Sequence, residues 1–120
     1  MNLVELFRSE ENIVTIPKGQ TVFAEGDLGD AMFVLLDGSV EISVHGLKLE
    51  EAGPGTIMGE MSLIDNSPRA ATVVAMSDCK LAIIEINGFK FLIRESPDFA
   101  ICVMQVMAYR LRNTDKFLRD

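Results

Sequence analysis

The sequence predicts a mainly β domain, an eight-stranded jelly-roll β-sandwich with a short N-terminal helix and two C-terminal helices. Two observations support this fold class. Short apolar or alternating runs, separated by turn residues, follow one another from Ile13 to Ile86, as in sandwich and jelly-roll domains. From Asn87 onward the apolar residues recur with a helical period instead. A chain of 120 residues is long enough for one domain with one continuous core.

The N-terminal helix is expected over residues 3–7, where Leu3, Leu6 and Phe7 fall on one side. The strands follow at short intervals, with glycine, proline and aspartate at the turns between them. Asp37-Gly38 is a strong signal for a tight turn between two strands. The clearest strands are residues 13–16, 21–24, 32–36, 40–44, 47–50, 72–75 and 80–86. We therefore assign the jelly roll to residues 13–86.

The C-terminal helices are assigned to residues 87–118. Asn87 is expected to cap a helix that runs to Arg94. Ser96-Pro97 then begins the last helix, with serine as N-cap and proline at the first helical position, and this helix reaches Leu118.

The last helix carries two apolar stripes. The first has the alternating spacing of four and three that is typical of a coiled-coil seam, and the second lies beside it. A helix that is apolar over so wide an arc buries two faces. We expect one face on the sandwich and the other in a homodimer, although both could pack within one monomer. The first stripe is Ala100, Met104, Met107, Leu111, Thr114 and Leu118, and the second is Phe99, Val103 and Val106.

The composition narrows the function. The formal net charge is −7, which argues against non-specific nucleic-acid binding and requires any anion site to concentrate its positive charge locally. Cys79 and Cys102 lack metal-like spacing and read as small buried hydrophobes. The only histidine, His45, cannot form a metal site alone. No signal peptide and no membrane-spanning run are apparent, so we expect a cytoplasmic protein.

The candidate site lies in residues 59–72. A helix that begins near Gly59 would present N–H groups without intrahelical partners to a phosphate, and glycine lets a ligand approach the backbone closely. Arg69 offers a planar fork that can hold two phosphate oxygens. Glu60 would be repelled by a phosphate, so it fits if it accepts a hydrogen bond from a ligand hydroxyl or is balanced by a cation. Each residue considered alone has another interpretation: Glu60 could only interact favourably with the helix dipole, and Arg69 could be a solvated surface residue.

The whole string resembles the phosphate-binding cassette of cyclic nucleotide-binding domains. This family includes the regulatory subunits of cyclic-AMP-dependent protein kinase and the bacterial catabolite activator proteins. The resemblance is carried by Gly59-Glu60, Ser62, Leu63 and Pro68-Arg69-Ala70-Ala71-Thr72. It implies that Glu60 accepts a hydrogen bond from the ribose 2′-hydroxyl and that Arg69 holds the cyclic phosphate. The ligand-binding residues that it implies are Gly59, Glu60, Met61, Ser62, Arg69, Ala70 and Ala71.

The resemblance also implies a ligand. Members that bind cyclic GMP often have a hydroxyl residue just after the arginine, and Ala70 in that position favours cyclic AMP, with cyclic GMP as the alternative. No cofactor or metal is implied. By similarity to the long helix of the bacterial activators, Thr114 and Asn113 would contact the adenine, and Arg110 would offset the charge of Glu60. Each of these three could equally be a solvated helix residue.

We therefore predict a single domain over residues 1–120 that is a non-catalytic cyclic AMP sensor and transmits occupancy by movement of its C-terminal helices. The alternative is a degenerate domain of the same fold that serves only for protein association. A cupin-like enzyme would need a cluster of histidines with a carboxylate, which a single histidine cannot supply. No helix-turn-helix follows the last helix, so nucleic-acid binding by this chain is not expected. Whether the chain is complete or a fragment stays open.

Overall fold

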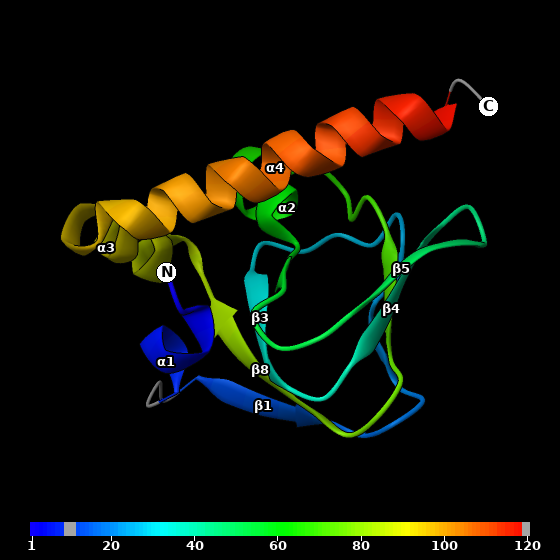
Figure 1. Ribbon diagram of the computed structural model, residues 1–120, viewed down its shortest axis with the longest axis horizontal. Helices are drawn as coiled ribbons and strands as arrows, with labels where there is room; N and C mark the ends of the chain where they lie inside the picture. Colours follow the sequence, from blue (N-terminus) through cyan, green and yellow to red (C-terminus); the bar gives the residue numbers. More distant parts are fainter. Residues whose placement is uncertain (9–11, 119–120) are drawn as a thin grey trace.

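The computed structural model describes residues 1–8 and 12–118, with the side chains described up to residue 113. Eight strands form two four-stranded sheets in which every pair is antiparallel, and the sheets pack as a β-sandwich (Figure 1). The first sheet has the order β1 (Ile13–Ile16), β8 (Cys79–Ile84), β3 (Met32–Asp37) and β6 (Ile57–Met58). The second has the order β2 (Thr21–Phe23), β7 (Thr72–Ala75), β4 (Val40–Val44) and β5 (Leu47–Ala52). The predicted eight-stranded sandwich is confirmed.

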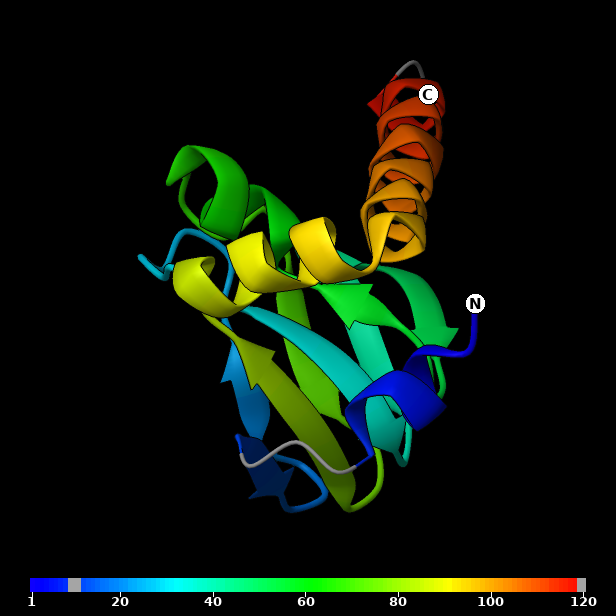
Figure 2. The ribbon, with the colours of Figure 1, turned by 90° about the vertical axis from the view of Figure 1, so that its left-hand side faces the viewer.

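Four helices accompany the sheets in the described part of the chain: α1 (Leu3–Phe7), α2 (Glu60–Asp65), α3 (Ile86–Glu95) and α4 (Pro97–Leu118). Asn2 caps α1, since its side-chain oxygen accepts a hydrogen bond of 3.2 Å from the Glu5 N–H. In Figure 1, α4 lies across one end of the sandwich and passes above α2. Figure 2 shows α3 crossing in front of the sheets before the chain turns sharply into α4. The short N-terminal helix and the two C-terminal helices are confirmed.

The predicted boundary between the last strand and the helix that follows it was wrong. β8 ends at Ile84, and α3 begins at Ile86 with Glu85 as its N-cap, so Asn87 is not the cap but a residue of the first turn. Glu85 has extended backbone angles, and its carbonyl accepts a hydrogen bond of 2.9 Å from the Phe89 N–H, which closes the first turn. The helical hydrogen bonding therefore begins at Glu85, two residues before Asn87, which the sequence analysis predicted as the cap.

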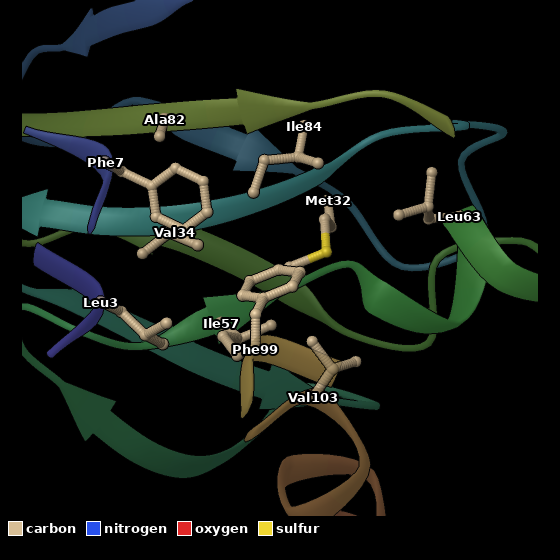
Figure 3. Close-up of a cluster of buried hydrophobic side chains, with 10 residues drawn as sticks. All are labelled: Leu3, Phe7, Met32, Val34, Ile57, Leu63, Ala82, Ile84, Phe99 and Val103. Carbon is tan, nitrogen blue, oxygen red and sulfur yellow. The ribbon is translucent and has the colours of Figure 1, made fainter. Parts of the chain in front are cut away.

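The helices join the sandwich through a cluster of buried apolar side chains (Figure 3). At its centre Phe99 of α4 is fully buried, and its ring meets that of Phe7 edge-on at a centroid distance of 5.7 Å. Phe89 of α3 contacts the same ring at 6.0 Å, and Val103 lies one turn further along α4. A second cluster, which includes Ile42 and other residues of the second sheet, fills the other part of the sandwich.

The two apolar stripes of α4 have different surroundings. The second stripe packs inward, with Phe99 and Val103 buried and Val106 half-buried. The predicted coiled-coil seam is divided: Met104 and Leu111 are 54% and 73% exposed, whereas Ala100 and Met107 are half-buried and Met107 packs against the core cluster. The seam positions 114 and 118 lie outside the residues whose side chains are described. The structure thus places one face of α4 on the domain and leaves another exposed.

The two cysteines are both free. Cys79 is buried, as expected, whereas Cys102 on α4 is only partly so.

Candidate ligand site

The site begins where β6 runs into α2. Gly59 connects them with left-handed backbone angles, φ 77° and ψ 14°, and the helix starts at Glu60 as the sequence predicts. A Cβ at this position would lie 2.5 Å from Nη1 of Arg69 and 3.1 Å from the carbonyl oxygen of Ala31. Glycine is therefore required here for two reasons, the positive φ and the close approach of the arginine.

The end of α2 is set by its polar residues. Asn66 takes the left-handed conformation with φ 58°, and its N–H donates to the Ser62 carbonyl at 3.0 Å. The Ser67 N–H then donates to the Asp65 carboxylate at 3.0 Å. Hydrogen bonding by the side chain of Ser67, and next by its backbone, lowers the pKa of Asp65 from its ordinary value. The chain can thus turn at once toward Arg69.

Arg69 is held by backbone on both sides. Its N–H donates to the Asp27 carbonyl and its own carbonyl accepts from the Gly26 N–H, each at 2.8 Å, so the cassette is tied to the loop after β2. The side chain is 6% exposed, and Nη1 donates to the carbonyls of Ala31 at 2.7 Å and Gly59 at 3.3 Å. The guanidinium carbon lies 4.5 Å from the centroid of the Phe23 ring.

This buried cation lacks a counter-ion in the described part of the chain, where no carboxylate forms an ion pair with Arg69. Burial lowers the pKa of the Arg69 guanidinium from its ordinary value, and the charges of Asp30 and Asp27 only partly oppose this. Both hydrogen bonds of the guanidinium come from Nη1, and Nε and Nη2 have no acceptor among the described residues. The fork therefore keeps donors for an anion.

Glu60 is also buried, with 2% of its side chain exposed, and it pairs with Arg110 of α4. Nη1 of Arg110 donates to both carboxylate oxygens, at 2.7 and 2.9 Å, and Nη2 donates to the Ile57 carbonyl at 2.6 Å. The expected offset of the Glu60 charge by Arg110 is therefore present. Each carboxylate oxygen keeps acceptor capacity for one more donor. The pair joins α4 to the head of α2.

These groups share one cavity of about 400 Å³, a size typical of small-molecule sites. Of the predicted site residues, it brings together Gly59, Glu60, Met61, Ser62, Arg69, Ala70, Ala71, Arg110 and Asn113. The remaining one, Thr114, lies in α4 with a side chain outside the described residues. The amide of Asn113 donates to the Tyr109 carbonyl of its own helix at 2.7 Å, which leaves its oxygen as an acceptor.

The rest of the cavity wall was missed by the sequence analysis. These residues come mostly from the inner face of the second sheet and from α4, and they are Phe23, Ile42, Val44, His45, Leu49, Glu50, Met58, Val73 and Tyr109. The alternation in residues 40–44 indicates which side chains point inward. It does not indicate that the inner face of this strand lies opposite residues 59–72 across a cavity. The cavity thus offers a cation for an anion, a carboxylate for a hydroxyl, and apolar walls for a flat ring.

Neither a metal site nor a membrane-spanning helix is found among the described residues. No group of three or more His, Cys, Asp or Glu side chains there could hold a metal ion. No helix in the same part of the chain is long and apolar enough to span a membrane.

Comparison with known proteins places the cavity in context. Residues 13–96 match the family described as "Cyclic nucleotide-binding domain". The chain is 30% identical over 112 residues to a CRP-like cAMP-activated global transcriptional regulator of Mycobacterium tuberculosis, covering 89% of this chain and 50% of that protein. It is 38% identical over 82 residues to a cAMP-dependent protein kinase regulatory subunit of Aspergillus niger, covering 67% of this chain and 20% of the relative.

A solved structure agrees with these sequence matches. The catabolite activator protein of Thermus thermophilus superposes with a TM-score of 0.82 and 34% identity, covering 96% of this chain and 56% of that chain. The present chain thus spans about half the length of the bacterial regulators that it matches.

Proposed function

The chain belongs to the cyclic nucleotide-binding domain family, and on this premise we propose that it is a non-catalytic sensor that binds cyclic AMP in the cavity beside α2. The relatives it matches are named as regulators and regulatory subunits, which supports a sensing role. The observation that carries the proposal is Arg69, a buried cation on the cavity wall with no carboxylate ion pair among the described residues.

The cyclic phosphate binds at Arg69 and at the N–H groups that open α2. A bound phosphate supplies the charge that Arg69 lacks, and a guanidinium in a largely dry site binds it more strongly than in water. Ala70 and Ala71 line the same cavity with small side chains, so their backbone is accessible to the ligand. Together these groups explain why an acidic chain can hold an anion.

The ribose binds at Glu60. The carboxylate is fixed by Arg110 and faces the same cavity as Arg69, so a sugar hydroxyl can donate to the acceptor capacity that remains. A cyclic phosphate with an adjacent 2′-hydroxyl matches this pair of groups. Cyclic GMP carries the same phosphate and sugar, and it is the competing ligand.

Ligand binding affects the position of α4 through Arg110. A hydroxyl that hydrogen-bonds to Glu60 changes the environment of the Glu60–Arg110 pair, and Arg110 also holds the Ile57 carbonyl at the end of β6. The ligand thereby favours one position of α4 over others, which is a population shift. The exposed apolar face at Met104 and Leu111 is the surface through which the C-terminal helix forms a homodimer.

Isothermal titration calorimetry tests the function. Protein freed of nucleotide should release heat with cyclic AMP, while 5′-AMP, whose phosphate is not cyclised, should bind much more weakly. Arg69→Lys should weaken cyclic AMP by about 10- to 100-fold, because a point charge replaces a two-pronged donor. Arg94→Lys is the matched control, since Arg94 lies exposed on α3.

A second arm tests Glu60. Glu60→Ala should reduce the preference for cyclic AMP over its 2′-deoxy analogue, because the acceptor for the hydroxyl is gone. The proposal fails if the wild-type chain binds neither cyclic AMP nor cyclic GMP, or if Arg69→Lys behaves like Arg94→Lys.

A further inference from the structure

Glu50 is a carboxylate on the inner face of the second sheet. Ile42 of β4 lies opposite Val73 on one side and opposite Glu50 of β5 on the other. Residues opposite each other across strands project from the same face of a sheet. Because Val73 and Ile42 are 1% and 6% exposed, this row faces the interior, and all three residues line the cavity. Glu50 is half-buried at the end of the row.

A break in the strand register brings Leu49, the neighbour of Glu50, to the cavity as well. The pairing of β4 with β5 shifts between Ile42 and Ser43, so Leu49 has no partner across the ladder. Such bulges turn side chains away from strict alternation. As a result Leu49 contacts the cavity together with Glu50.

Glu50 has no partner of its own in the described part of the chain. Its carboxylate forms no ion pair and accepts no hydrogen bond there, whereas Glu51 pairs with Lys48 at 3.1 Å and Glu60 pairs with Arg110. A half-buried carboxylate that no protein donor reaches keeps its acceptor capacity for water or for a ligand. The arrangement therefore leaves an acceptor on the cavity wall for a ligand that donates a hydrogen bond.

We propose that Glu50 reads the base: it accepts a hydrogen bond from the exocyclic amino group at position 6 of adenine. This inference rests on the proposed function, since it assumes a cyclic nucleotide with its phosphate at Arg69. Adenine carries an N–H donor at position 6, whereas guanine and hypoxanthine carry a carbonyl there. A carboxylate accepts from the first and is repelled by the second. Glu50 is thus the residue that selects cyclic AMP.

A structural role for Glu50 makes a different prediction. β5 is the outer strand of its sheet, and an inward-pointing charge on an edge strand discourages pairing with another chain. Under that explanation, removal of the charge promotes self-association and leaves base selectivity unchanged.

Calorimetry with cyclic AMP and cyclic inosine monophosphate separates the two explanations, because the base of the latter replaces the 6-amino group by a carbonyl. Wild-type protein should prefer cyclic AMP, and Glu50→Ala should reduce that preference about tenfold, the size expected for one hydrogen bond to a charged acceptor. Glu50→Gln keeps the shape and can donate to a carbonyl, so it should gain affinity for the inosine nucleotide. Glu51→Ala removes a charge from the exposed neighbour and should leave the ratio unchanged.

The outcomes are distinct. A ratio in Glu50→Ala and Glu50→Gln equal to that of the wild type overturns the role of Glu50, and self-association of Glu50→Ala together with that ratio assigns it to edge protection. A wild-type chain that binds no cyclic nucleotide overturns the proposed function and this inference with it. Melting curves of each variant verify that the binding data come from folded protein.

Discussion

Replacement of Arg110 by methionine tests the link between α4 and the site most directly. The change removes three hydrogen bonds, two to Glu60 and one to the Ile57 carbonyl, and leaves a carboxylate that is 2% exposed without its cation. Breaking a buried ion pair on one side costs about 3 kcal/mol or more. For a domain of this size that corresponds to a fall in melting temperature of about 12 °C.

The effect of Arg110→Met is measured by thermal and urea unfolding of ligand-free protein. Arg112→Met is the matched control, because Arg112 lies on the same helix with an exposed side chain. The double variant Glu60→Gln with Arg110→Met should recover much of the loss, since no buried charge remains. A single variant as stable as Arg112→Met, or a double variant whose loss equals the sum of the single losses, would refute the reasoning.

Two further predictions follow from the same structure. Gly59→Ala should destabilise the fold by roughly 1–2 kcal/mol, because an alanine at a positive φ is strained, and should abolish nucleotide binding, because its Cβ would clash with Arg69. Gly55→Ala is the control, since Gly55 also has a positive φ but open space around its Cβ. In melting curves it should lose similar stability, and in calorimetry it should keep the affinity. Leu111→Glu should convert the proposed homodimer into monomers, because it places a charge on the exposed apolar face of α4. Light scattering measures the molar mass, and a value equal to that of the wild type would remove Leu111 from the interface.

The sequence analysis succeeded where local chemistry decides the structure. The helix from Leu3 to Phe7 and the start of α4 at Pro97 were predicted correctly, because apolar spacing and proline act within a few residues. Strand ends were less accurate, since β3 and β5 continue to Asp37 and Ala52 through hydrogen bonds that only the partner strand provides. The cap of α3 was missed because any residue with extended backbone angles can end a strand and begin a helix, as Glu85 does.

The cassette was recognisable because its residues are close in sequence. The far wall of the cavity was not, because Glu50 and Tyr109 come from β5 and α4 and meet only after folding. The shift in strand register that brings Leu49 inward depends on pairing across the sheet and has no signal in the sequence of β5 alone. Arg110 was connected with Glu60 only through the family resemblance. The roles of all these residues in ligand binding stay predictions for the experiments above.

The two halves of α4 are attached in different ways. Near its start, Phe99 and Val103 are buried among side chains from the first sheet and α1, so this half cannot leave without opening the core. Beyond Val106, among the residues whose side chains are described, Met107 packs partly against the core cluster and Tyr109 and Leu111 are exposed. In the same segment, the polar contacts to the rest of the domain are those of Arg110. Within the described residues, displacing this segment therefore requires the loss of the Arg110 contacts and of the partial burial of Met107. Under the proposed function, this distal half is therefore the part of α4 that we expect a bound nucleotide to reposition while the core stays intact.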